Sequence, residues 1–472
     1  MFKKFCLFIF VCIFSISCKK EESIKKNGDI NPQKYIYDSY GRTLILHGLN
    51  TSSSAKGEPE RQPWITEADV QREHEEFGFN FVRYLIFWDA IEPERDVFDD
   101  AYLDKVQTRV EWYTSRGMQV MLDMHQDVYS SVFGADGAPA WAVETNGHPI
   151  NTDGTGPWWL KNADPAVIAA WTNFWKYGEH KHLQDHYILA WKKVMERFKD
   201  NPNVIGYDLM NEPWGGDLVK VFITGDFERK WLADFYGRMI PALREVEPNK
   251  YLFFEPTPAP VTFGAASNLP AVTDTRDEPR LVYAPHCYPY DTHEGLGYTA
   301  SSQENLKDWE TQRRIDTKKH GDIPLMCGEF GLSPTQDGFD VYLKDVMAVF
   351  DRNLWHWAYW SNDLGGWSPL NADGTETAIL PYLLRTYPKA VAGTIEEFSY
   401  DHDSKAFSLS FISNSGIAQP TEIFIPKRYY PGGYKLAISG VSDYSTSYDE
   451  TTQVLKLDVN ENGKTVRIEI GK

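Results

Sequence analysis

The chain has 472 residues, which is more than one ordinary domain needs and enough for a barrel of about 200–250 residues with a companion module. Hydrophobic residues make up 42% of it, including 16 Trp and 26 Tyr, so a core of this size needs no disulfides. The formal net charge of −19 argues against nucleic-acid binding and against electrostatic attraction to an anionic membrane.

The N-terminus has the pattern of an export signal. Residues 1–17 combine an early pair of lysines with an apolar run over residues 5–14 that is too short to span a bilayer. The Ser-Ile-Ser triplet before Cys18 resembles a bacterial lipobox, which implies lipidation of Cys18 and a polar tether over residues 18–33. We therefore expect an exported lipoprotein of the outer membrane or cell surface, anchored to the membrane through its N-terminus; plain secretion is the alternative.

Residues 34–388 alternate predicted strands and helices, the pattern of a parallel sheet. One amphipathic helix is predicted over residues 183–200 and ends before Pro202. The predicted strands cover residues 44–49, 81–87, 119–124, 204–211, 252–255, 281–288, 325–329 and 355–360. Eight strands are what a closed (β/α)8 TIM barrel requires, so the predicted fold class is α/β.

Residues 389–472 have a different sequence pattern, with short runs of alternating apolar and polar residues separated by Gly, Asn, Asp and Ser. This pattern predicts a C-terminal all-β sandwich domain. Its strands are expected over residues 407–412, 421–425, 434–438, 454–459 and 465–470. Two roles remain open for it: support for the barrel, or binding of carbohydrate or lipid.

Polar and aromatic side chains gather at the predicted strand ends, where a parallel barrel places its active site. They are Arg83, His125, Asp127, Asn211, Glu212, His286, Tyr288, Glu329 and Trp360. The charged loop with Asp89, Glu92 and Glu94 is instead expected at the surface. Cys287 and Cys327 are predicted to lie on opposite faces of the sheet, which argues against a disulfide between them.

Glu212 and Glu329 have the arrangement that retaining glycoside hydrolysis requires. That reaction uses two carboxyl groups about 5–5.5 Å apart, one as acid and base and one as nucleophile. An ionised Glu329 is expected to raise the pKa of Glu212, while Arg83 and Tyr288 are expected to keep Glu329 charged. The chemistry needs no metal ion and no organic cofactor.

The sequence resembles glycoside hydrolase family 5, and within it the endoglycoceramidases and related glycosylceramide-cleaving enzymes. The first likeness lies in Asn211-Glu212-Pro213 with Glu329 at a later strand end. The more specific strings are His-Gln-Asp-Val-Tyr over residues 125–129 and Gly-Ala-Pro-Ala-Trp over residues 137–141. The resemblance covers nearly all of the chain after the N-terminal signal.

The resemblance implies a role for each matching residue. Glu212 would be the proton donor, Glu329 the nucleophile and Asn211 the partner of the 2-hydroxyl of the reacting sugar. Tyr288 would bond to Glu329. The remaining substrate-binding residues would be Lys56, Arg83, His125, Asp127, Trp175, His286 and Trp360. Each also has a purely structural interpretation: an ion pair for Arg83, a satisfied polar pair for His125 and Asp127, and barrel core for His286 and Trp360.

The function implied is hydrolysis of the β-bond between glycan and ceramide in glycosphingolipids, by a monomer. An apolar channel would hold the ceramide, with candidates Tyr290, Leu296, Tyr298, Leu364 and Trp367. The first alternative is a family 5 endo-β-glucanase or mannanase, or an exo-β-glycosidase acting on another aglycone. A non-catalytic glycan-binding surface lipoprotein is the more distant alternative. Such binders commonly lose a catalytic carboxylate, whereas this sequence has both Glu212 and Glu329.

Overall fold

The computed structural model describes residues 32–151 and 158–472. The predicted signal peptide and Cys18 lie outside the described residues. Among the described helices, none is both long and apolar enough to cross a membrane.

Eight parallel strands form the barrel in the order β7-β6-β5-β4-β3-β2-β9-β8. Their bounds are β2 His47–Asn50, β3 Phe81–Phe87, β4 Gln119–His125, β5 Val204–Asp208, β6 Tyr251–Phe254, β7 Leu281–Tyr283, β8 Met326–Cys327 and β9 His356–Tyr359. A parallel bridge between Tyr283 and Leu325 joins the two outer strands of this order. The predicted α/β barrel is therefore confirmed.

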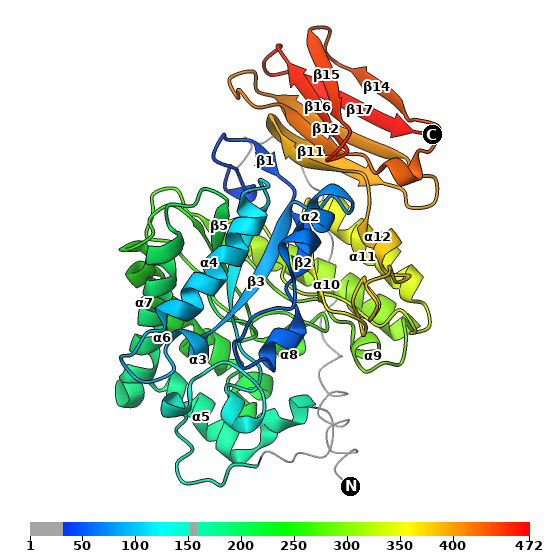
Figure 1. Cartoon of the computed structure of the whole chain (residues 1–472). Helices are drawn as coiled ribbons and strands as arrows, with labels where there is room; N and C mark the ends of the chain where they lie inside the picture. The colour runs from blue at the N-terminus through cyan, green and yellow to red at the C-terminus, as the bar shows by residue number, and fades with distance from the viewer. Residues whose placement is uncertain (1–31, 152–157) are drawn as a thin grey trace. The chain divides into compact units, whose positions relative to one another are not determined.

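Helices surround the barrel strands (Figure 1). They are α2 Glu67–Glu75, α3 Trp88–Ile91, α4 Asp100–Thr114, α5 Pro165–Trp175, α6 Tyr177–Phe198, α7 Ala233–Arg244, α8 Pro258–Val261, α9 Tyr290–His293, α10 Ala300–Lys319, α11 Phe339–Asn353 and α12 Leu380–Leu383. Local sequence explains several starts: Asp99 accepts a hydrogen bond from the Tyr102 amide at the start of α4, and Asp164 caps α5 directly before Pro165.

Short helices lie in the connecting loops. They are the 3-10 turns η1 Pro32–Lys34, η2 Ser53–Lys56, η3 Ser131–Phe133, η4 Ala140–Ala142, η5 Trp158–Ala163 and η8 Lys427–Tyr429, and the π-helical turns η6 Val219–Ile223 and η7 Phe227–Leu232. Both π-helical turns follow β5, the strand that leads to Glu212.

The C-terminal module consists of two antiparallel sheets. The first has the order β1 Thr43–Leu44, β10 Tyr387–Val391, β13 Thr421–Phe424, β16 Val454–Val459 and β15 Tyr444–Asp449. The second has the order β11 Gly393–Tyr400, β12 Phe407–Ser413, β17 Thr465–Gly471 and β14 Lys435–Ser439. The module lies at the end of the barrel away from α3, α8 and α9 (Figure 1).

The first predicted strand divides between the two parts of the molecule. Thr43 and Leu44 pair with β10 in the C-terminal sheet, whereas His47–Asn50 pair with β3 and β9 in the barrel. Gly48 permits the close barrel contact, because a Cβ there would lie 1.9 Å from the Phe81 carbonyl oxygen. Because the apolar run is continuous where the chain passes from one sheet to the other, its pattern predicts a single strand.

Two predictions were wrong: the surface exposure of Glu92, and the placement of Cys287 and Cys327 on opposite faces of the sheet. Glu92 is fully buried: its carboxylate lies 2.6 Å from His186 Nδ1 and accepts from the Trp88 indole, so partners compensate its burial. The thiols of Cys287 and Cys327 are free and lie in the same apolar cluster between strands and helices, not on opposite faces.

Candidate active site

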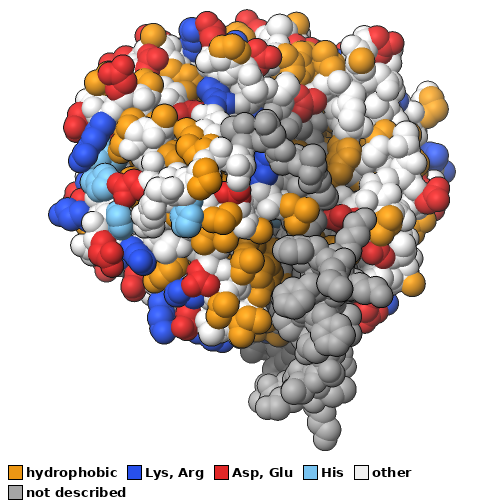
Figure 2. Space-filling view, turned by 90° about the horizontal axis from the view of Figure 1, so that it is seen from below, with side chains coloured by type: hydrophobic (Ala, Val, Ile, Leu, Met, Phe, Trp, Pro, Cys, Tyr) orange, Lys and Arg blue, Asp and Glu red, His pale blue; other side chains and the backbone are white. Residues whose placement is uncertain are grey.

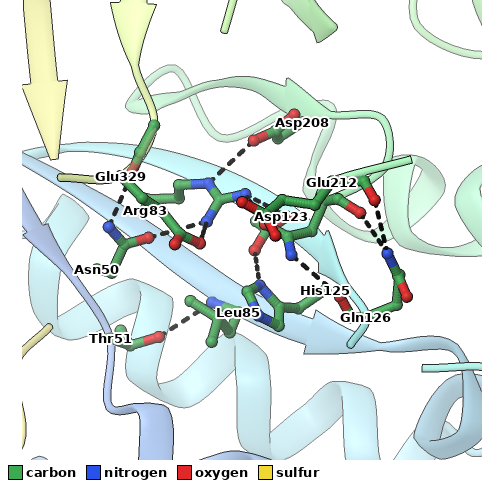
Figure 3. Close-up of polar contacts among 12 residues, drawn as sticks. Asn50, Thr51, Arg83, Leu85, Asp123, His125, Gln126, Asp208, Glu212 and Glu329 are labelled. Atoms are coloured by element: carbon green, nitrogen blue, oxygen red, sulfur yellow. Dashed lines mark hydrogen bonds and ion pairs between the residues drawn. The ribbon is translucent and has the colours of Figure 1, made fainter. Parts of the chain in front are cut away.

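The carboxyl ends of the barrel strands form one face of the molecule, shown in Figure 2. Figure 3 shows that acidic side chains from several strands converge there on Arg83, and that Glu212 and Glu329 approach this cluster from different strands. The site is thus assembled from sequence positions far apart in the chain.

Glu212 and Glu329 face each other through His286. The Nδ1 atom of His286 lies 2.8 Å from Glu212 Oε1 and 3.6 Å from Glu329 Oε2. One carboxylate oxygen from each glutamate lies within 4.8 Å of the other. Glu329 is held from both sides, because Arg83 Nη1 donates to its Oε1 at 2.9 Å and the Tyr288 hydroxyl donates to its Oε2 at 3.0 Å.

Arg83 is completely buried and lies beneath the site. Its Nε donates to Asp208 Oδ2 at 2.9 Å, and its Nη2 lies 3.0 Å from Asp123 Oδ1 and 3.1 Å from Glu255 Oε1. With no exposed surface, Arg83 positions Glu329 rather than presenting a polar face to a ligand. The contacts of Arg83 therefore match its structural interpretation, an ion pair within the barrel.

Burial shifts the pKa values of the acidic residues around Arg83. Burial raises the pKa of Glu255 to about 8, and the nearby Asp208 charge adds to this effect. Burial also raises the pKa of Asp123 well above its usual range, against the opposing charge of Arg83. Burial thus opposes the charged form of both carboxyl groups.

The pKa of Glu212 differs from the expectation. Burial raises it, but the hydrogen bond and charge of His286 outweigh burial and hold the pKa below its usual range. Burial opposes the charge on His286, yet Glu255 and Glu329 raise its pKa well above the ordinary value. The predicted influence of Glu329 on Glu212 is overridden because a cation lies between the two carboxylates. The two shifts together favour a proton on His286, whose Nδ1 lies 2.8 Å from Glu212 Oε1.

A second polar group lies beside the glutamates. Lys56 Nζ bonds to Asp127 Oδ2 at 2.5 Å and lies 4.3 Å from the centre of the Trp360 ring. The His125 ring stacks on Trp360 with centroids 5.4 Å apart, and its Nδ1 lies 2.6 Å from Asp123 Oδ2. These predicted sugar-binding residues do come together, around the Trp360 ring.

One predicted contact differs in the structure and another is compatible with it. Asn211 Oδ1 accepts from Arg83 and one N–H of its Nδ2 donates to the Gln126 carbonyl, so the second N–H of Nδ2 is left for the predicted bond to a sugar hydroxyl. Trp175 is only 3% exposed and is stacked on Trp171 at 5.7 Å. The expected stacking of Trp175 on a sugar is therefore corrected: edge contacts to Phe174, Phe227 and Phe235 enclose the ring.

Several site residues were not singled out from the sequence. Asn50 Oδ1 accepts from Arg83, and Glu255 Oε2 accepts the Glu212 amide at 2.9 Å. Glu255 ends a predicted strand, so the strand-end rule that identified Glu212 also applies to it. Asp208 gave no such signal, because it precedes the end of the predicted strand over residues 204–211.

Two groups of side chains in the described chain come close enough to share a cation: His125 with Asp127 and Asp136, and Glu212 with His286 and Glu329. In both groups a positive side chain already lies against the carboxylates. It is the Lys56 ammonium in the first group and the His286 ring in the second.

Apolar side chains are exposed on the same face as the site (Figure 2). Tyr290, Leu296 and Leu364, three of the channel candidates, are 39%, 66% and 42% exposed. Tyr298 is buried and its hydroxyl donates to Asp345, which removes it from the candidates. The η6 segment, which sequence reasoning missed, adds Val219 and Ile223 at 57% and 65% exposure.

Known proteins resemble this chain over nearly its whole length. Endoglycoceramidase I of Rhodococcus hoagii is 32% identical over 424 residues, covering 86% of this chain and 81% of that protein. A solved ganglioside GM3 complex of endo-glycoceramidase II from Rhodococcus sp. is 36% identical with a TM-score of 0.85, covering 93% of this chain and 99% of that one. Its lactosyl-enzyme intermediate is 37% identical, with a TM-score of 0.84 and the same coverage.

Family models match both parts of the chain. The cellulase model of glycosyl hydrolase family 5 matches residues 37–366, and the model of the family 5 C-terminal domain matches residues 385–470. The barrel, the two facing glutamates and these matches agree: the chain belongs to glycoside hydrolase family 5 and is an endoglycoceramidase-like member of it.

Proposed function

We propose that this glycoside hydrolase cleaves the β-glycosidic bond between the glycan and ceramide of glycosphingolipids, with retention of configuration. The observation that carries the proposal is the pairing of Glu212 and Glu329 within 4.8 Å, in a chain similar to an endo-glycoceramidase whose structures include a ganglioside complex. This close approach suits a nucleophilic carboxylate, because the carboxyl groups of retaining enzymes lie closer together than those of inverting enzymes.

In the proposed first step, Glu329 attacks the anomeric carbon and Glu212 protonates the departing ceramide oxygen. The proton reaches Glu212 Oε1 from His286 Nδ1, 2.8 Å away. In the second step Glu212 removes a proton from water, which releases the glycan from Glu329, and the proton returns to His286. Arg83 and Tyr288 hold the free carboxylate of Glu329 in place before it attacks and after the glycan is released.

The residues around Glu212 and Glu329 are assigned to contacts with the sugar or with the ceramide. Trp360 covers one face of the reacting sugar, while Lys56, His125 and Asp127 read its hydroxyl groups. The exposed apolar residues of η6 and of the loops after β7 and β9 are assigned to the ceramide. Polar sugar contacts combined with exposed apolar residues favour a substrate with one sugar end and one lipid end over a polysaccharide.

The test is incubation of residues 19–472 with lactosylceramide, a ganglioside, carboxymethyl-cellulose and mannan, with mass spectrometry of the products. Intact oligosaccharide with free ceramide is expected. Release of sugars from the polysaccharides alone would retain the two glutamates but overturn the substrate. Binding without turnover on all four would favour a glycan-binding protein instead.

We also propose that the protein is exported, lipidated at Cys18 and attached to a membrane as a monomer. The support is the lysine-led apolar run, Cys18 and the polar residues after it. Metabolic labelling with a radioactive fatty acid tests this directly. Label is expected in the full chain and not in Cys18→Ala, and equal labelling of both would contradict lipidation at Cys18.

A further inference from the structure

A polar cavity of about 260 Å³ lies at the opposite end of the barrel from the active site. Residues before β3 and at the start of β4 line it on the barrel side, and β10, β13 and β16 line it on the side of the C-terminal module. The amino ends of barrel strands carry no part of the proposed chemistry, so the lining needs its own explanation.

Lys389 is the unusual group in this cavity. It is only 5% exposed, and its ammonium makes neither a hydrogen bond nor an ion pair with any residue in the described part of the chain. The ladder between β10 and β13 is interrupted between Pro388 and Ala390, so Lys389 occupies a β-bulge. Bulges redirect side chains, and this one directs a lysine into a buried space.

The acidic groups of the lining are already committed. Asp38 Oδ2 accepts from Arg42 Nε at 2.7 Å, and Glu422 lies 3.4 Å from Arg42 Nη1. Asp449 Oδ1 accepts the amides of Thr451 and Thr452. Glu422 therefore acts on Lys389 only at longer range.

A second cation of the lining is also uncommitted. Lys456, half-buried, makes no hydrogen bond or ion pair within residues 32–151 and 158–472, and the buried Nδ1 of His74 and Oε1 of Gln119 lack hydrogen-bond partners there. Burial lowers the pKa of Lys389 to about 8, which the charge of Glu422 only partly offsets. An isolated buried ammonium is costly unless a counter-charge reaches it.

We propose that this cavity binds a small oxyanion, such as inorganic phosphate or a short carboxylate, with Lys389 and Lys456 as its cationic ligands. The anion contacts the barrel and the C-terminal module at once and stabilises their junction. The site is independent of the catalytic proposal, because none of its residues lies at the carboxyl ends of the barrel strands.

The test compares the thermal unfolding of wild type, Lys389→Met and Lys456→Met in phosphate, succinate and chloride at equal ionic strength. Lys435→Met, which removes an exposed lysine of the same module, is the matched control. Phosphate or succinate is expected to raise the Tm of wild type and of the control by about 2 °C or more over chloride. The anion that gives the rise identifies the preferred class.

Lys389→Met is expected to abolish the rise while unfolding at a higher temperature than wild type in chloride, because it removes an uncompensated charge. Should that variant not fold, Lys456→Met is expected to weaken phosphate or succinate binding at least tenfold by titration calorimetry. No specific anion response in wild type, or an equal response in all variants, would overturn the proposal. Activity on a soluble aryl lactoside is expected to be unchanged in every variant.

Discussion

At the scale of single residues, the two glutamates have different surroundings. Glu329 accepts hydrogen bonds from Arg83 and Tyr288, whereas Glu212 Oε1 lies 2.8 Å from His286 Nδ1. Replacing either residue by Ala is expected to lower turnover of lactosylceramide by about a hundredfold to ten-thousandfold without changing the fold.

Azide separates the two roles. With an activated aryl lactoside, azide is expected to restore turnover of Glu212→Ala with a β-lactosyl azide product, because the covalent intermediate still forms. Glu329→Ala is expected to give the α-azide, since azide then replaces the nucleophile directly. Product anomers are read by NMR, with thermal melting as the folding control; identical anomers from the two variants would contradict the assignment.

Glu255 is expected to make the stability of the protein depend on pH. Its pKa is raised to about 8 in the folded state, so the folded protein holds a proton that the unfolded chain loses above its ordinary pKa of 4.5. Stability is therefore expected to fall as the pH rises between these values, and the raised pKa of His286 acts in the same direction.

Glu255→Gln cannot lose this proton and is expected to flatten the decline of Tm between pH 5 and about 8. Glu278→Gln, at an exposed position, is the matched control and is expected to follow wild type. Parallel Tm curves for all three proteins would show that Glu255 is ionised at neutral pH and would contradict the account.

At the scale of secondary structure, periodicity predicted the barrel strands well because each is buried and continuous in sequence. Periodicity did not predict strands whose position depends on how sheets pair or where a sheet ends. The strand predicted over residues 44–49 serves two sheets, and β15 was missed because its Tyr-Ser-Thr-Ser-Tyr-Asp sequence lies at an exposed sheet edge with no apolar alternation. β10 was missed because Pro388 and Lys389 interrupt its apolar residues.

The candidate site likewise contains residues that the sequence predicted and residues that it did not. Strand-end reasoning identified Glu212, Glu329 and their neighbours, because parallel strands end on one face. It did not identify Asp208, since which carboxylates meet Arg83 depends on how far each strand extends. Trp175 was assigned by resemblance alone, and only the packing of neighbouring rings shows that it is enclosed.

The η6 segment gives an element-level prediction. Ile223 is 65% exposed in the loop that follows the strand leading to Glu212, so a lipid aglycone is expected to cover it. Ile223→Ser is expected to raise KM for lactosylceramide at least about fivefold, because serine buries less apolar surface against the lipid, and to leave an aryl lactoside unaffected. Ile315→Ser, which removes an isoleucine 54% exposed on α10, is the control; equal KM values for all three proteins would exclude η6 from lipid binding.

At the scale of the whole molecule, the barrel and the C-terminal module share structure. The strand β1 belongs to the C-terminal sheet, although it precedes the barrel in sequence. Tyr387 stacks on His47 at 4.0 Å, and its hydroxyl donates to the Gly78 carbonyl at 2.8 Å. These contacts favour a supporting role for the module over an independent binding domain.

A chain ending at residue 384 is therefore expected to lose both activity and cooperative thermal unfolding. The full chain is expected to unfold in one calorimetric transition. As a control, a protease cut in the exposed turn at Ser415 is expected to leave activity unchanged, because both sheets remain assembled. An active, folded barrel without residues 385–472 would contradict the supporting role.

Retaining cleavage of a glycan from ceramide releases the sugar in the anomeric form that it had in the substrate. Time-resolved proton NMR of lactosylceramide hydrolysis reports the anomeric form of the first-released sugar alongside free ceramide. We expect β-lactose at first, with α-lactose appearing only by later mutarotation. Initial release of α-lactose would contradict the roles of Glu212 and Glu329, and intact lactosylceramide beside hydrolysed polysaccharide would contradict the substrate.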